Sequence, residues 1–150
     1  MPGEACPIPS EPTRSDAELI AWMLGGKRIA VVGASDRPNR PANYVPSYMM
    51  EQGYDIIPVN PQYEAVWGFR SYNSVAEVPG TVDLVNVFRR PEFCADVVKD
   101  AIAAEAGGIW IQSGIRSDEA RRLAREAGLA YVEDHCIMVE HMRWGKRIRD

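Results

Sequence analysis

The sequence has few cysteines, no long apolar stretch and no excess of positive charge. Its three cysteines, Cys6, Cys94 and Cys136, form an odd and widely spaced set, which excludes a disulfide framework and fits no zinc-ligand spacing. The apolar runs are only a few residues long, far short of a transmembrane helix. The net charge of −4 gives no general attraction to nucleic acid or to an anionic membrane. We therefore expect free thiols, and neither a nucleic-acid nor a membrane partner.

The two ends of the chain differ in composition from the rest. Residues 1–14 are polar and rich in proline, and they lack the basic start and apolar core of a secretory signal, so we expect a flexible N-terminal segment of a cytoplasmic protein. Residues 143–150 are predicted to be a basic C-terminal tail, with a solvated chain end as the favoured interpretation and contact with an acidic partner as the alternative. The length of 150 residues suits one domain with one core, which we place at 15–142.

Between these ends, short runs rich in β-branched residues alternate with helical patterns. Helices are predicted at residues 16–24, 43–52, 74–78, 91–104 and 118–127, and strands at 28–33, 55–59, 83–88, 109–112 and 129–133. The run from Arg28 to Gly33 is almost continuously apolar, as expected for a central parallel strand that is covered on both faces. Strands that alternate with helices in this way join as βαβ units. The predicted fold class is therefore α/β, a single domain with a three-layer, Rossmann-like, doubly wound parallel sheet.

The loops after the strands are the places to look for a ligand, because doubly wound sheets bind beyond the carboxyl ends of their strands. The turn Gly33-Ala34-Ser35 follows the central strand and precedes a helix, so its backbone N–H groups could receive an anion. Arg37 and Arg40 follow in the same loop, and guanidinium groups pair well with phosphate. This combination predicts a ligand with more than one phosphate group. The alternative is a tight turn with two solvated arginines.

Two common nucleotide-binding motifs are missing. G-x-G-x-x-G is absent, because Ser35 and Pro38 stand where its second and third glycines would be. The second strand ends in Val59-Asn60-Pro61, where an NAD-binding protein would carry an acidic residue for the ribose. G-x-x-x-x-G-K-[ST] is also absent, which argues against a P-loop NTPase. NAD is therefore a poorer candidate than another phosphorylated cofactor.

Five segments follow one another along the chain in a specific order, namely IAVVGAS, RPNRPAN, GYDIIPVNP, VDLVNVFRRPE and DHCIMVEH. In this order they resemble the small bacterial and archaeal CoA-binding proteins, which are similar to the CoA-binding domain of succinyl-CoA synthetase α subunits and of ADP-forming acyl-CoA synthetases. The resemblance covers residues 15–143. It implies a Rossmann-like domain that binds coenzyme A and holds its diphosphate near the turn at 33–35 and Arg40.

The resemblance also implies the path of the rest of the cofactor. Pro61 and the turn at residues 88–91 would line the nucleotide and the pantetheine arm. Residues 112–114 match the position of a loop in the synthetases, although the sequence there differs from theirs. The ligand-binding set expected from the motifs and the resemblance is Gly33, Ala34, Ser35, Arg37, Arg40, Asn60, Pro61, Phe88, Arg89, Arg90, Pro91, Gln112, Ser113, Gly114 and Cys136.

No complete catalytic arrangement and no metal-ligand pattern is visible in the sequence. A synthetase α subunit continues into a second domain with a phosphorylated histidine, whereas this sequence ends at Asp150, so we do not expect ligase activity from this chain alone. Asp134-His135-Cys136 is the most enzyme-like segment, but neighbouring side chains on an extended segment point apart. A more modest hypothesis places Cys136 near the pantetheine thiol, with which it would form a reversible mixed disulfide under oxidising conditions.

The sequence thus predicts a stand-alone, non-catalytic module that binds CoA or an acyl-CoA in a sensing, carrier or regulatory role. Two alternatives stay open. One is an enzyme, either an NAD(P)-linked reductase or one half of a split acyl-CoA synthetase with an ATP-grasp partner subunit. The other is a protein-interaction module that uses the basic tail. A homodimer is compatible with each of them, since protein subunits commonly pair about a two-fold axis.

Overall fold

The computed structural model describes residues 16–149, with side chains up to residue 145. The proposed N-terminal segment at 1–14 and Cys6 lie outside the described residues. The helices are α1 (Asp16–Leu24), α2 (Pro41–Glu51), the short 3-10 helix η1 (Val75–Glu77), α3 (Pro91–Ala103), α4 (Asp118–Glu126) and α5 (Ile137–Arg149). The strands are β1 (Arg28–Val32), β2 (Asp55–Val59), β3 (Ala65–Val66), β4 (Phe69–Arg70), β5 (Leu84–Val87), β6 (Gly108–Ile111) and β7 (Ala130–Val132).

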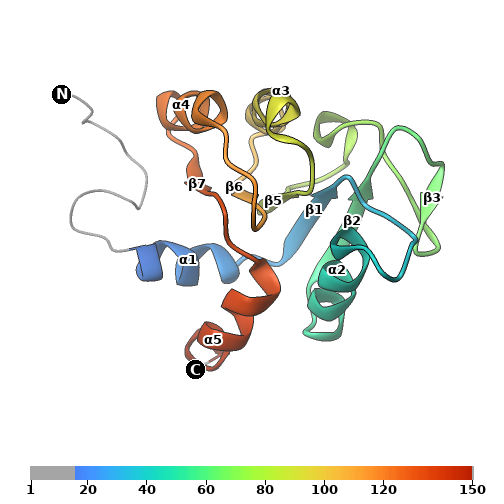
Figure 1. The fold of residues 1–150 in the computed structure, drawn as a ribbon, viewed down its shortest axis with the longest axis horizontal. Helices are drawn as coiled ribbons and strands as arrows, with labels where there is room; N and C mark the ends of the chain where they lie inside the picture. Colours follow the sequence, from blue (N-terminus) through green and yellow to red (C-terminus); the bar gives the residue numbers. More distant parts are fainter. Residues whose placement is uncertain (1–15, 150) are drawn as a thin grey trace.

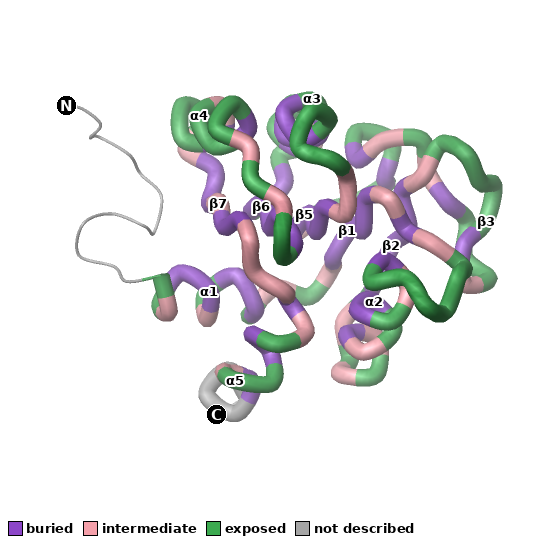
Figure 2. The backbone as a smooth tube through the Cα atoms, in the orientation of Figure 1, coloured by how far each residue is buried: buried purple, intermediate pink, exposed green. Residues whose placement is uncertain are grey.

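Five of the strands form one parallel sheet in the order β2-β1-β5-β6-β7, and helices cover both of its faces (Figure 1). Successive strand residues point to opposite faces, so Val31 and Trp110 join the core under α1, α2 and α5. Their neighbours Val32 and Ile111 join the core under η1, α3 and α4. The five parallel strands are accordingly the most continuously buried part of the chain (Figure 2). The predicted three-layer, Rossmann-like, doubly wound sheet is confirmed.

Several element boundaries follow from local chemistry that the sequence displays. Pro41 and Pro91 begin α2 and α3, where the missing N–H of proline costs no hydrogen bond. The hydroxyl of Ser117 accepts a hydrogen bond from the N–H of Ala120 at 3.1 Å and caps α4.

No helix among residues 16–149 is long and apolar enough to cross a bilayer.

The helix α5 is the main element that the periodicity of apolar residues does not predict. Residues 143–149, which the sequence suggested to be a basic tail, form its last turns. The face of α5 that packs into the molecule carries Glu140 and His141, both about 5% exposed, so its pattern reads as polar. Because this buried face contains a carboxylate and an imidazole, the sequence pattern did not indicate the helix, which covers part of one face of the sheet.

The small antiparallel sheet of β3 and β4 was also not predicted. Its two strands are joined by Trp67 and Gly68, both with positive φ (56° and 78°), as in the type I′ turn of a tight hairpin. A tryptophan rarely adopts this conformation. Here its backbone N–H donates to the carboxylate of Asp36 at 2.8 Å, and its indole N–H donates to the carbonyl of Ser35 at 2.9 Å. The hairpin thereby attaches to the loop after β1.

Candidate functional site: a cleft at the switch point of the sheet

A cleft opens at the carboxyl ends of β1, β5 and β6, on the face that α2 and α5 cover. The chain runs from β1 outward to β2 and then returns to β5 on the other side of β1, so the direction of winding reverses there. Ligands of doubly wound sheets bind at such switch points. The cleft has a volume of about 830 Å³, within the range of small-molecule sites. The expected site residues that line it are Gly33, Ser35, Arg37, Arg40, Phe88, Gln112, Ser113 and Cys136.

Four other residues of the expected set, described next, do not line the cleft. Ala34 is fully buried at the turn. Arg90 and Pro91 are exposed at the start of α3. Gly114 continues the loop after β6 and has a positive φ of 85°. None of these four residues forms part of the cleft wall.

Pro61 and Arg89, two further residues of the expected set, do not line the cleft and lie on the opposite face of the sheet. They line a separate cavity of about 230 Å³ beside α3. The cause is the alternation of side chains: Phe88 faces α2 and α5, and the next residue turns to the α3 side. There the guanidinium carbon of Arg89 lies 4.5 Å from the ring centre of Phe93.

Gly33 is the residue whose shape allows the cleft to form. Its φ is 90°, and a Cβ atom built on it would lie 2.8 Å from the carbonyl oxygen of Phe88. The two loops are held together because the N–H of Phe88 donates to the carbonyl of Val32 at 2.9 Å. On the other side, the N–H of Gly33 donates to the carbonyl of Val59 in β2, also at 2.9 Å. Only glycine combines the left-handed conformation with this close approach.

Side-chain amides hold the carbonyl groups of the turn. The Nδ2 atom of Asn60 donates to the carbonyl of Ala34 at 2.9 Å, and the Nδ2 atom of Asn43 donates to the carbonyl of Ser35 at 2.8 Å. The indole of Trp67 donates to the same Ser35 carbonyl. Asn60 therefore supports the turn from outside the cleft, and the turn is preorganised on three sides.

The backbone N–H groups of the turn are less available than the sequence suggested. The N–H of Gly33 is used by the Val59 carbonyl, and the N–H of Ser35 donates to the carbonyl of Ala42 at 3.3 Å. The latter bond arises because Pro46, four residues after Ala42, has no N–H to donate to that carbonyl. A phosphate at this turn would therefore depend more on side-chain cations than on a full nest of amides.

Arg37 and Arg40 supply positive charge at the mouth of the cleft. Both residues are exposed, and both line the cleft. Within residues 16–145, neither of them has a carboxylate within ion-pair distance. The nearest acid in sequence, Asp36, is occupied by the N–H of Trp67. Two arginines without an acidic partner in the described part of the chain are suited to a phosphorylated ligand.

The rest of the wall is mostly apolar, and the sequence did not predict it. Met138 and Val139 come from α5, Tyr44 comes from α2, and Tyr63 comes from the loop after β2. The residues on α5 were missed together with their helix. Tyr44 lies four residues after Arg40, so the same helix-face spacing could have identified it. The cleft thus combines a cationic mouth with an apolar wall.

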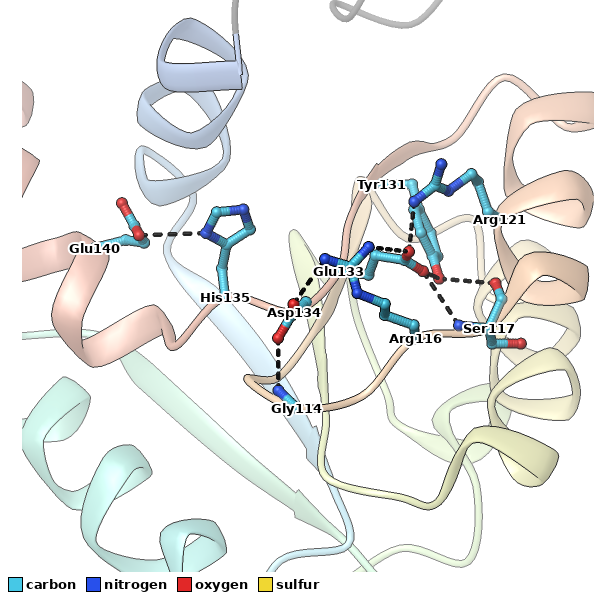
Figure 3. Close-up of polar contacts among 9 residues, drawn as sticks. All are labelled: Gly114, Arg116, Ser117, Arg121, Tyr131, Glu133, Asp134, His135 and Glu140. Carbon is cyan, nitrogen blue, oxygen red and sulfur yellow. Dashed lines mark hydrogen bonds and ion pairs between the residues drawn. The ribbon is translucent and has the colours of Figure 1, made fainter.

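A polar network at the end of β7 fixes the loop that forms one rim of the cleft (Figure 3). The carboxylate of Glu133 is buried and accepts hydrogen bonds from the N–H of Ser117 at 3.2 Å and the hydroxyl of Tyr131 at 2.9 Å, and it is ion-paired with Arg121. Asp134 accepts from the N–H of Gly114 at 2.7 Å.

Arg116 joins these two carboxylates. Its Nη2 atom donates to Asp134 at 2.8 Å, and its Nη1 atom lies 3.7 Å from Glu133 (Figure 3). The loop from 113 to 117 is therefore tied to the end of β7 by both backbone and side-chain bonds. Because Ser113 and Ile115 in this loop line the cleft, the network holds that rim in place.

The charges of this network are stabilised by their hydrogen bonds. Burial alone would raise the pKa of Glu133, but the bonds from Ser117, Tyr131 and Arg121 outweigh it and hold the pKa below its usual range. The Gly114 N–H, followed by Arg116, lowers the pKa of Asp134. Burial, together with the neighbouring Glu133, raises the pKa of the Tyr131 hydroxyl. The network is thus ionic at neutral pH and acts as a positioning element.

The two cysteines that the structure describes differ in their environment. Cys94 is a fully buried residue of α3, its thiol donates to the carbonyls of Arg89 and Arg90, and burial raises its pKa to about 11. Cys136 is partly exposed and lines the cleft. The imidazole of His135 lies 3.3 Å from Glu140 and is directed to that carboxylate (Figure 3). Within residues 16–145 no cluster of His, Cys, Asp and Glu is arranged to hold a metal ion.

Comparisons with known proteins identify the family. The family model described as CoA binding domain matches residues 27–142. YneT of Bacillus subtilis is 40% identical over 127 residues, which make up 85% of this chain and 94% of YneT. The alpha subunit of the ADP-forming acetate–CoA ligase II of Pyrococcus furiosus is 30% identical over 130 residues. That match covers 79% of this chain but only 28% of the ligase subunit.

Solved structures agree with the fold. A hypothetical protein from Pyrococcus horikoshii superposes with a TM-score of 0.83 at 42% identity, over 86% of this chain and 92% of that one. A Thermus thermophilus protein gives a TM-score of 0.80 at 43% identity, over 86% of this chain and 98% of that one. With a family model that matches most of its length and a Rossmann-like sheet around the cleft, the protein belongs to the CoA binding domain family.

Proposed function

We propose that the cleft binds coenzyme A or an acyl-CoA, and that the chain acts as a stand-alone, non-catalytic module that senses, carries or regulates this cofactor. The observation that carries the proposal is the composition of the cleft. Arg37 and Arg40 form a cationic mouth beside a rigid glycine turn, and the wall continues as an apolar surface with Phe88 and Met138. CoA has the matching character, since a polyanionic nucleotide is joined to a long and nearly uncharged arm.

NAD fits the same loops less well. In a dinucleotide-binding domain, the residue after the second strand would bind the ribose hydroxyls through a carboxylate. Here Asn60 stands after β2, and its amide is occupied on both sides, by the carbonyl of Ala34 and by the N–H of Gln62. This favours a CoA-type ligand, whose phosphates meet the arginines.

The bonds of the nearby polar groups support a binding role over catalysis. His135 faces Glu140, and Asp134 faces Gly114 and Arg116. The enzyme-like segment Asp134-His135-Cys136 thus directs its acid and its imidazole into structural contacts.

Thermal unfolding with a panel of ligands tests the proposal. The full chain is heated with CoA, acetyl-CoA, dephospho-CoA, NAD, NADP or ATP at equal excess. A ligand at a hundred times its Kd stabilises the native state by about 2.7 kcal/mol, so we expect CoA to raise the Tm by several degrees. A smaller shift with dephospho-CoA would mean that an arginine contacts the 3′-phosphate. A shift with NADP and none with CoA would overturn the proposal.

A second candidate function rests on the ligase relative. Because the Pyrococcus furiosus match is to one subunit of an ADP-forming acetate–CoA ligase, the chain could serve as the CoA-binding part of a split synthetase. Co-expression with an ATP-grasp subunit from the same cell and size-exclusion chromatography of the mixture test this idea. A stable complex that forms acetyl-CoA from acetate, ATP and CoA would favour it. Two separate peaks without that activity would favour the stand-alone module.

A further inference from the structure

We propose that Cys136 is a modification site, at which the protein forms a mixed disulfide with the thiol of CoA. This inference rests on the proposed function, since it requires the pantetheine arm in the cleft. The first observation is the contrast between the two described cysteines. Cys136 is partly exposed and lines the cleft, whereas Cys94 is fully buried with its thiol bonded to two carbonyl groups. Of these two cysteines, only Cys136 borders the space that a ligand would occupy.

The spacing between the strands places Cys136 within reach of the pantetheine arm. The cationic mouth follows β1, and Cys136 follows β7. The segment that contains Cys136 also lies beside β6, since the N–H of His135 donates to the carbonyl of Ile111. From β1 to β6 or β7 there are two or three strand spacings, which is about 10–15 Å. The arm from the diphosphate to the sulfur has about thirteen bonds. If each bond extends the arm as much as a bond of an extended polypeptide does, the arm spans about 15 Å.

A second and independent observation lies between the two ends of the cleft. Gln112 lines the cleft, and its Nε2 atom donates to the Oδ1 atom of Asn86 at 2.6 Å. Asn86 is 1% exposed, and among the described residues its Nδ2 atom has no hydrogen-bond partner. Buried amides are normally satisfied, so an unpaired amide that is bonded to a residue of the cleft wall favours a ligand with polar groups beside Gln112. The two amides of the pantetheine arm would pass Gln112 before the sulfur meets Cys136.

The reaction is thiol–disulfide exchange with CoA disulfide, the symmetrical disulfide of the ligand. The thiolate of Cys136 attacks one sulfur of the disulfide, the bond between the two CoA sulfurs breaks, and the bond between Cys136 and CoA forms. The second CoA leaves as a thiolate and takes up the proton that Cys136 lost. A small thiol reverses the exchange and releases CoA.

Mass spectrometry of the full chain tests the proposal. The reduced protein is treated with CoA disulfide and, in parallel, with glutathione disulfide, and the adducts are mapped on peptides. We expect one CoA per chain on Cys136, formed about tenfold faster than the glutathione adduct, because the bound arm raises the local concentration of the disulfide. A CoA analogue without sulfur should slow the reaction. The Cys136→Ser variant should give no CoA adduct, and the Cys94→Ala variant should react like the wild type.

The outcomes separate this inference from the proposed function. If CoA raises the Tm but the adduct is absent, or lies on Cys6 or Cys94, the modification site is overturned and CoA binding stands. If CoA disulfide and glutathione disulfide react with Cys136 at the same rate, the pantetheine sulfur does not reach the residue and the inference also fails. If CoA does not change the Tm, the proposed function is overturned, and the inference that rests on it is overturned as well. Circular dichroism of each variant establishes that it is folded.

Discussion

At the scale of single residues, the cleft depends on one glycine that nothing else can replace. Gly33 and Gly53 have similar φ values of 90° and 99°, but a Cβ atom at Gly33 would lie 2.8 Å from the Phe88 carbonyl, and one at Gly53 would meet nothing within 4 Å. Both alanine variants pay for the left-handed backbone conformation, and Gly33→Ala also forces the two loops apart. The difference between the two positions therefore isolates the close approach.

We expect Gly33→Ala to lower the free energy of unfolding by about 1–3 kcal/mol more than Gly53→Ala does. Urea denaturation of both variants and the wild type measures the difference. Gly33→Ala should also weaken CoA binding, because the turn and the Phe88 loop shift together. Equal destabilisation by the two substitutions would show that the loops have room to adjust.

Arg40 is the residue whose charge can be tested most directly. It lines the cleft, belongs to an exposed position and has no acidic partner among the described residues. If its guanidinium makes a charge-assisted bond to a phosphate, Arg40→Ala should weaken CoA binding by about 1–3 kcal/mol, which is about five- to 150-fold in Kd. Isothermal titration calorimetry measures this change. Arg122→Ala, an exposed position on α4, is the matched control and should bind as the wild type does.

At the scale of elements, the network at the end of β7 holds the rim of the cleft through a buried charge. Glu133→Gln removes the charge that pairs with Arg121 and Arg116. Since both arginines are largely exposed, the expected loss at neutral pH is about 1–3 kcal/mol, less than for a fully buried pair. Glu126→Gln, at an exposed acid on α4, is the control and should change the stability by less than about 0.5 kcal/mol.

The same network predicts how the stability depends on pH. The pKa of Glu133 is lowered in the folded protein, so its contribution is complete above the ordinary glutamate pKa of about 4.3 and is lost as the pH falls through the lower folded pKa. The free-energy difference between the wild type and Glu133→Gln should therefore be constant from pH 7 to about pH 5 and shrink below about pH 4. Urea denaturation at a series of pH values checks this. A difference that does not change on acidification would contradict the ionic role of Glu133.

The sequence predicted the elements whose chemistry is local or apolar. The parallel strands were found because both of their faces are buried and their residues are apolar throughout, as Val31 and Val32 show. The start of α4 was found because Ser117 is a side-chain cap. By contrast, the buried face of α5 carries the polar residues Glu140 and His141, so it does not show an apolar helical pattern. The turn of the hairpin contains a tryptophan with positive φ, which is not a typical turn residue. Tertiary contacts stabilise these two elements, so no local pattern displays them.

The same distinction applies to the candidate site. Residues of the turn after the first strand, such as Gly33 and Arg37, were predicted because the fold class fixes where strand ends meet. Gln112 was predicted from the family resemblance. The apolar wall from α5 and the opposite direction of Arg89 depend on packing and on the alternation of side chains, which require the strand and helix ends to be known to one residue. The cationic part of the cleft was therefore visible in the sequence, and most of the apolar part was not.

At the scale of the whole molecule, two electrostatic effects act on a polyanionic ligand in opposite directions. The net charge of −4 repels CoA at long range, whereas Arg37 and Arg40 attract it at the mouth of the cleft. Asp55, for example, begins β2 and lies a strand length of about 13 Å from the carboxyl edge of the sheet, where the cleft opens. This distance exceeds the screening length of about 10 Å at 0.1 M salt. At physiological salt the local attraction therefore exceeds the long-range repulsion.

The salt dependence of binding separates these two effects. For the wild type, we expect Kd to rise about three- to tenfold between about 0.05 M and about 0.5 M sodium chloride, because salt screens the arginine contacts. In a variant with both Arg37→Ala and Arg40→Ala, only the repulsion by the net negative charge is left, so added salt should leave Kd unchanged or lower it. Titration calorimetry of both proteins at several salt concentrations provides the comparison. If the double variant kept the wild-type slope, the phosphates of the ligand would have to meet other cations, and the cationic mouth would not be the phosphate site.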